Sequence, residues 1–181
     1  CMRQEKPLPA ELSRAESVMW EHPDSALSIL RSMPQSSLSI GKNYATWALL
    51  LAQARDKVYG KRLPDSLNIP FSDKLVQDAM DYFEKEGNLK RMAQTYYYKG
   101  QLLKDQKKIT EAMPFFLKSK EMMTKLDEPL FTYLICQSLG NTYRYQDLYE
   151  ESLVQLKDAY QYALRSGNGE RISYALSELG R

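Results

Sequence analysis

Residues 93–105 read AQTYYYKGQLLKD, and the glycine inside this helix-forming stretch points to the fold. Gly in a helix interior costs roughly 1 kcal/mol relative to Ala, so Gly100 needs a structural reason. Glycine recurs at Gly140 and Gly180, at intervals of 40 residues. Turn-forming pairs recur at the same interval, at 87–88, 127–128 and 167–168. The chain therefore carries an internal repeat, and this repeat is the first guide to its architecture.

Each period holds two helical stretches separated by a short polar break. Residues 90–105 and 109–126 carry apolar side chains at helical spacing, and residues 131–146 and 148–166 repeat the pattern. RISYALSELGR at 171–181 begins a third copy. The predicted fold class is all-α, built from tandem antiparallel helix pairs. We expect small residues to let paired helices approach closely, with Gly100 opposite Ala112 and Gly140 opposite Ser152; Ala159 and Gly180 are assigned the same packing role.

The amino-terminal half is less regular, although it is also helical in pattern. Residues 43–60 and 71–87 form a predicted pair joined by a proline-containing loop. The resulting division is a tether at 1–10, a helical hairpin at 11–40 and an irregular pair with a long loop at 41–89. Full repeats follow at 90–129 and 130–169, and the first helix of a truncated repeat occupies 170–181.

The pattern resembles the tetratricopeptide repeat. The match is closest at Leu139, Gly140 and Tyr143, whereas Lys99 and Cys136 depart from the family pattern, and the 40-residue period exceeds the usual ~34. The resemblance implies a right-handed superhelix whose concave side is lined by first helices and binds a protein or peptide. Carried onto this chain, the partner-binding positions are Gln94, Tyr97, Gln101, Lys104, Leu134, Gln137, Asn141, Arg144 and Tyr174.

The beginning of the sequence resembles a processed bacterial lipoprotein, in which a terminal cysteine precedes a polar tether. Cys1 is followed by MRQEKPLPAE, and the chain as a whole is similar to envelope-anchored tetratricopeptide proteins of Bacteroidetes. This resemblance implies lipidation at Cys1 and a location at the bacterial cell envelope, facing the periplasm. Contact with a membrane is then expected through that anchor only.

The sequence offers little for catalysis. His22 is the only histidine, and it precedes a helix-initiating proline rather than a nucleophile motif. Two cysteines without a CxxC or Cys/His cluster predict no metal site, and the isolated glycines form no phosphate loop. We therefore expect a protein that is not an enzyme and uses no cofactor. A formal net charge of +2 gives no reason to expect nucleic acid as a partner.

The expected function is a non-enzymatic scaffold that binds a protein or peptide of unidentified sequence; self-association is left open. A sensor portion of a longer membrane-associated signalling or transcription regulator remains an alternative. A weaker alternative is a small-molecule or glycan-binding lipoprotein with Tyr97 and Trp47 as stacking platforms. Within the tyrosine triplet, Tyr97 is the candidate contact residue, although all three rings could equally serve packing.

Charge is divided unevenly along the repeats. Residues 90–125 contain nine Lys or Arg and three Asp or Glu, whereas residues 126–160 contain two and six. An anionic partner of the first run and a solvated outer helix face are both compatible with this division.

Overall fold

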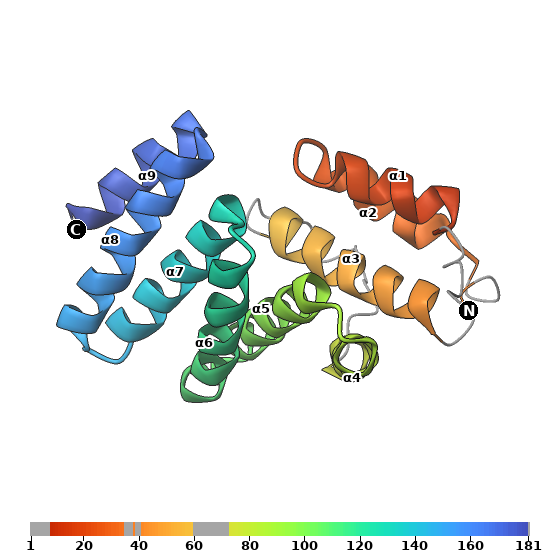
Figure 1. Cartoon of the computed structure of the whole chain (residues 1–181), viewed down its shortest axis with the longest axis horizontal. Helices are drawn as coiled ribbons and strands as arrows, with labels where there is room; N and C mark the ends of the chain where they lie inside the picture. Colours follow the sequence, from red (N-terminus) through yellow and green to blue (C-terminus); the bar gives the residue numbers. More distant parts are fainter. Residues whose placement is uncertain (1–7, 35–37, 39–40, 60–72, 181) are drawn as a thin grey trace. The chain divides into compact units, whose positions relative to one another are not determined.

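The computed structural model describes residues 8–34, 38, 41–59 and 73–180, and these residues form nine α-helices that pack mostly against their sequence neighbours (Figure 1). The predicted all-α class is confirmed. Contacts divide the chain into two compact units, Cys1–Glu86 and Gly87–Arg181. Cys1, the first part of the expected tether and the whole of the expected loop at 61–70 lie outside the described residues.

The first unit is organised around its third helix. α1 (Ala10–Val18) packs on α2 (Pro23–Ser32), and α3 (Lys42–Tyr59) contacts both of these helices and α4 (Asp73–Glu86). Residues 45–54 of α3 are all buried, because neighbouring helices cover several of its faces. This burial explains the continuous apolar run WALLLA at 47–52, which a one-sided amphipathic helix would not need.

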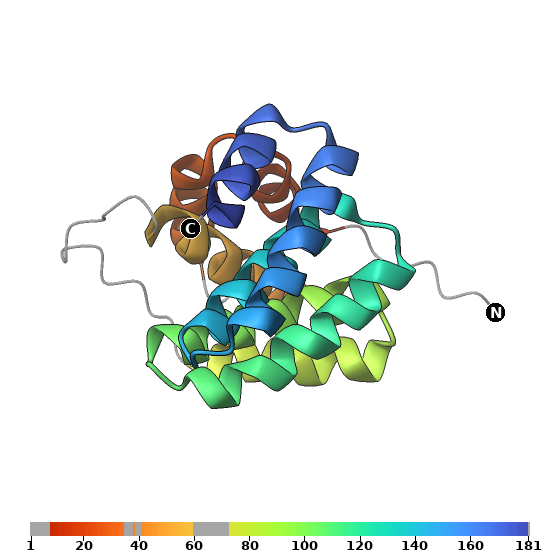
Figure 2. The ribbon, with the colours of Figure 1, turned by 90° about the vertical axis from the view of Figure 1, so that its left-hand side faces the viewer.

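The second unit continues as consecutive helices joined by short turns. It consists of α5 (Leu89–Asp105), α6 (Ile109–Lys125), α7 (Pro129–Arg144), α8 (Tyr149–Ser166) and α9 (Gly169–Leu179). Each helix packs against the next, and Figures 1 and 2 show the chain doubling back at the turns between them. The expected tandem helix pairs are therefore present in this unit.

Left-handed backbone conformations end the helices at a regular interval. Gly87, Lys107, Asp127, Asp147 and Gly167 have φ values of 76°, 62°, 53°, 60° and 68°. These residues follow one another every 20 positions, which is half of the sequence period. A left-handed residue just past a helix end lets its amide bond back to the helix and reverses the chain. The half-period is thus one helix plus its turn.

The second helix of each pair buries a single stripe. On α6 the buried residues are Ala112, Phe116, Ser119 and Met123; on α8 they are Ser152, Leu156, Ala159 and Ala163. The members of the two stripes correspond one to one at a separation of 40 residues, so the sequence period is also a packing period. α6 runs through Pro114, its sixth residue, without ending.

Gly100 and Gly140 are both sites of close helix approach. A Cβ atom added to Gly100 would lie 2.6 Å from Cε1 of Phe116, and one added to Gly140 would lie 2.7 Å from Cδ2 of Leu156. The residue opposite Gly100 is therefore Phe116, one turn beyond the Ala112 that we expected. Ser152 does lie at Gly140, where its hydroxyl donates to the Gly140 carbonyl over 2.8 Å.

Gly180 has a different environment from the other two. It ends α9 and is exposed, and the only atom near a Cβ added there is the Ser177 carbonyl oxygen at 3.8 Å. The packing role that the repeat phase predicts for Gly180 has no counterpart among the described residues.

The uneven charge of the two runs is partly matched across neighbouring helix pairs. Lys120 of α6 donates to Asp158 of α8 over 2.7 Å, and Lys90 pairs with Glu128. Arg165 and Asp127 form a third pair. In each of these pairs the partners are 38 residues apart, which is close to one period. Part of the charge division therefore serves to join successive repeats.

Candidate functional site

Two adjoining pockets lie in the second unit, on the first helices of its successive pairs. The tyrosine pocket, of about 460 Å³, is lined by Tyr97, Gln101, Lys104, Tyr133, Gln137, Ser138, Asn141, Glu170, Arg171 and Tyr174. The end pocket, of about 790 Å³, is lined by Lys104, Asp105, Lys107, Ile109, Asn141, Arg144, Tyr145, Tyr174 and Glu178. Lys104, Asn141 and Tyr174 line both, so α5, α7 and α9 contribute to one continuous region.

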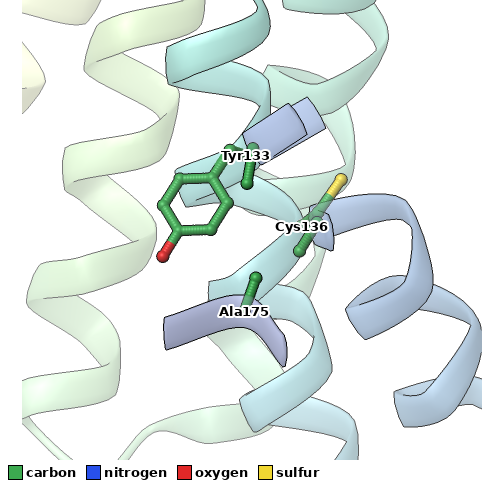
Figure 3. Close-up of a cluster of buried hydrophobic side chains, with 5 residues drawn as sticks. Tyr133, Cys136 and Ala175 are labelled. Atoms are coloured by element: carbon green, nitrogen blue, oxygen red, sulfur yellow. The ribbon is translucent and has the colours of Figure 1, made fainter. Parts of the chain in front are cut away.

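Most of the partner-binding positions inferred from the repeat pattern fall in these pockets. The structure brings together Tyr97, Gln101, Lys104, Gln137, Asn141, Arg144 and Tyr174. Two predicted positions lie elsewhere. Gln94 is buried beside Arg91, and Leu134 packs against the hydrophobic cluster of Tyr133, Cys136 and Ala175 shown in Figure 3.

The pockets also contain residues that the sequence analysis missed. Arg171 and Glu178 come from α9, and Tyr133 and Ser138 come from α7. The sequence period could have identified two of them, because Ser138 and Glu178 lie 40 residues apart, at the same phase of the repeat. Our set of groove positions omitted that phase.

The tyrosine triplet is buried as a whole. Tyr96, Tyr97 and Tyr98 are 6%, 2% and 2% exposed. The Tyr97 ring is surrounded by aromatic rings, with centroids of Tyr98 and Phe131 at 5.0 and 5.1 Å. Tyr97 lines the tyrosine pocket, and its hydroxyl accepts a hydrogen bond from Gln101 Nε2 over 2.7 Å. Its ring has no free face on which a ligand could stack.

Trp47, the second stacking platform considered for a glycan, is also a packing residue. It is 6% exposed, and its indole N–H donates to the Leu30 carbonyl over 2.9 Å. Trp47 belongs to the first unit and Tyr97 to the second. These positions give no support to a glycan site built on the two rings.

Gln101 lines the tyrosine pocket, and one of the two polar atoms of its side-chain amide has no hydrogen-bond partner among the described residues. Its Nε2 donates to the Tyr97 hydroxyl over 2.7 Å, while Oε1 is buried without a hydrogen-bond partner among the described residues. Gln101 as a whole is 9% exposed. A buried acceptor without a donor costs free energy in the folded protein, and natural structures contain few of them. A donor brought next to this atom would therefore gain a hydrogen bond that the folded protein leaves unmade.

Arg144 fixes the orientation of the Asn141 side chain, which lies one turn earlier on the same helix, α7. Its Nη2 donates to Asn141 Oδ1 over 2.7 Å and to Glu178 Oε2 over 3.1 Å. Arginine has no acceptor, so the Asn141 atom facing it must be the oxygen. The Glu178 side chain is 1% exposed and the Arg144 side chain 36% exposed, so this ion pair joins α7 to α9 at the edge of the pocket.

Cys136 is a packing residue rather than a reactive thiol. It is fully buried beside Tyr133 and Ala175, and burial raises the pKa of its thiol to about 11. Burial alone would lower the pKa of nearby Lys120, but the hydrogen bond to Asp158 and the electrostatic interactions with Cys136 and Asp158 together outweigh burial, so the pKa is raised. At neutral pH the thiol is protonated, which makes it a poor nucleophile.

The described residues hold no cluster of three or more His, Cys, Asp or Glu able to bind a metal ion. His22 is exposed at the start of α2, without a side-chain capping bond. Among the described helices, none combines the length and apolar character needed to cross a membrane.

No protein-family model matches the sequence, and no curated protein matches it either. The fold that the structure establishes is all-helical, with sequential pairs, and no family is identified.

Proposed function

We propose that the second unit is a tetratricopeptide-type array that binds an extended segment of another protein over α5, α7 and α9. One observation carries the proposal: seven of the nine positions assigned to partner contact line two adjoining pockets. These seven come from three separate helices and recur with the sequence period. A region that continues from one first helix to the next suits a chain lying across them, as in other stacked-repeat proteins.

The composition of the pockets supports a polar, non-catalytic contact. Amide side chains at Gln101, Gln137 and Asn141 offer donors and acceptors, and Tyr174 adds an exposed ring with a hydroxyl. Such groups recognise polypeptide without needing a reactive centre. The proposed protein is accordingly a binding scaffold, and the same site would serve the sensor portion of a longer signalling protein.

Attachment to the bacterial envelope through a lipid on Cys1 is part of this proposal. Its support is the lipoprotein-like sequence around Cys1, and not any contact in the structure. Mass spectrometry of the protein isolated from its native membrane would test it, since acylation adds a defined mass to the peptide that contains Cys1.

Peptide selection tests the binding proposal directly. Random peptides displayed on phage are selected on the full chain, and the affinities of the winners are then measured for two variants. Tyr174→Ala removes an exposed pocket ring, whereas Tyr149→Ala removes an exposed ring of α8 that lines neither pocket. We expect about a tenfold loss for the first variant only. Equal losses, or none for Tyr174→Ala, would show that the peptides bind elsewhere.

A further inference from the structure

Two residues that line the tyrosine pocket, Gln101 of α5 and Asn141 of α7, carry complementary hydrogen-bonding groups. On α5, Gln101 Oε1 is an acceptor without a partner among the described residues. On α7, Arg144 holds Asn141 Oδ1, which leaves Asn141 Nδ2 as a donor with no partner in the described part of the chain. The two residues occupy the same phase of the repeat, 40 positions apart.

An acceptor and a donor of this kind fit the main chain of a polypeptide. A peptide N–H can donate to Gln101 Oε1, and a peptide C=O can accept from Asn141 Nδ2. The match to Gln101 is the stronger argument, because a ligand N–H would satisfy an acceptor that the folded protein has already removed from water. A ligand without N–H groups would leave that acceptor unpaired.

A positive charge in the same region, that of Lys104, would favour peptides that carry acidic side chains. Lys104 lines both pockets and is half-buried, and no ion pair or hydrogen bond joins its ammonium group to another described residue. Arg144 differs, because the buried carboxylate of Glu178 already neutralises it. Lys104 lies one turn beyond Gln101 on α5, so a side chain beside the bound peptide group would reach it.

We propose that Gln101 and Asn141 bind the main chain of an extended acidic peptide, and that Lys104 binds one of its carboxylates. This inference rests on the proposed function and makes it specific. The main-chain contacts provide affinity without regard to sequence, and the lysine favours Asp or Glu at one place. Because an exposed charge pair is screened by salt, the preference for acidic peptides weakens as ionic strength rises.

The experiment uses the selected peptides and the full chain. Gln101→Met and Asn141→Leu keep the approximate side-chain size and remove the amides, and we expect each to weaken binding about tenfold. Lys104→Met should weaken binding of acidic peptides several-fold at low salt and have little effect at high salt. The matched controls are Gln161→Met and Lys157→Met, exposed positions of α8 outside both pockets, and they should leave affinity unchanged.

A second arm changes the peptide and leaves the protein intact. Methylating one main-chain nitrogen at a time removes single N–H donors, so one position should lose about tenfold in affinity for wild type and much less for Gln101→Met. The loss at one peptide position in wild type needs no protein variant, so it can be measured even if Gln101→Met proves unstable.

The outcomes separate the two proposals. One outcome would overturn this inference and leave the proposed function standing. In it, the selected peptides lose affinity for Tyr174→Ala, but they are not enriched in Asp or Glu and bind Gln101→Met as tightly as wild type. Failure to select any peptide that depends on Tyr174 would overturn both.

Discussion

Gly100 lies against the ring of Phe116, and a Cβ atom added to the glycine would meet Cε1 of that ring at 2.6 Å. Phe116 is fully buried, so the ring has little space into which it could move. The first helix of the pair has no side chain at this place, and the ring of the second helix fills the space. The same relation joins Gly140 to Leu156 one period later.

Gly100→Ala is expected to destabilise the protein. The substitution gains about 1 kcal/mol of helix propensity but forces a buried ring to shift, and overpacking of this kind costs about 1–3 kcal/mol. We expect a net loss of about 1 kcal/mol in the free energy of unfolding, measured by urea denaturation. Gly169→Ala is the control, since nothing lies within 4 Å of a Cβ there and its φ is not positive.

The double variant Gly100→Ala with Phe116→Leu tests the cause. If the ring is responsible, the two substitutions will cost less together than the sum of their separate effects, by about 0.5–1 kcal/mol. Simple additivity would mean that the glycine is required for another reason.

At the left-handed turn residues, adding a Cβ atom should lower the free energy of unfolding and removing one should raise it. Gly167→Ala places a Cβ at a φ of 68° and should lower the free energy of unfolding by about 1 kcal/mol. Lys107→Gly removes a Cβ from a φ of 62° and should raise it by up to about 1 kcal/mol. Thermal melts of both variants check this, and two shifts of the same sign would contradict it.

The stability of the protein should fall in alkaline solution because of two titratable side chains buried on α7. Burial raises the pKa of Cys136 to about 11, above its value of about 9 in the unfolded chain. Between these values the unfolded chain releases the thiol proton while the folded chain retains it, so folding becomes less favourable as pH rises. One such group contributes a loss of about 2 kcal/mol from pH ~9 to ~11.

Cys136→Ala measures the contribution of that thiol to the alkaline slope. Burial also raises the pKa of Tyr133, so part of the loss should remain in the variant. Urea denaturation at several pH values gives the slope, and an identical slope in wild type and variant would show that Cys136 titrates normally.

Gln101→Met should preserve stability while it weakens peptide binding. The substitution loses the hydrogen bond to the Tyr97 hydroxyl but also removes a buried acceptor that has no partner, so we expect a change within about 1 kcal/mol. Gln94→Met is the comparison. Gln94 is equally buried, and its Oε1 accepts from Arg91 over 3.4 Å, so that variant should lower stability. A large loss at Gln101 would assign it a purely structural role.

Sequence periodicity predicted the helix pairs of the second unit better than it predicted the residues that line the pockets. The phase of Gly100 and Gly140 located the helix pairs, because close helix approach requires a missing side chain at a fixed place. It did not identify Phe116 as the opposing residue, since the axial offset between two helices depends on how all their side chains fit. The turn signal was visible at Gly87 and Gly167 but not at Lys107, whose left-handed φ its residue type does not suggest.

Pocket residues were harder to predict for a similar reason. A repeat phase tells which side chains share a face, and it placed Gln101 and Asn141 together. It could not show that Arg144 would be neutralised by Glu178, because that pair depends on the packing of α7 against α9. Tyr97 lines the tyrosine pocket, but the sequence left open whether its ring packs or contacts a partner, since burial depends on neighbours such as Phe131.

The most direct measurement is an NMR titration of the ¹⁵N-labelled full chain with a selected acidic peptide, following the side-chain NH₂ signals of glutamine and asparagine. We predict that the Gln101 and Asn141 signals shift together and saturate at the same peptide concentration, while the exposed Gln161 signal stays in place. Shifts confined to Gln155 and Gln161 of α8, with Gln101 and Asn141 unchanged, would contradict binding across α5, α7 and α9.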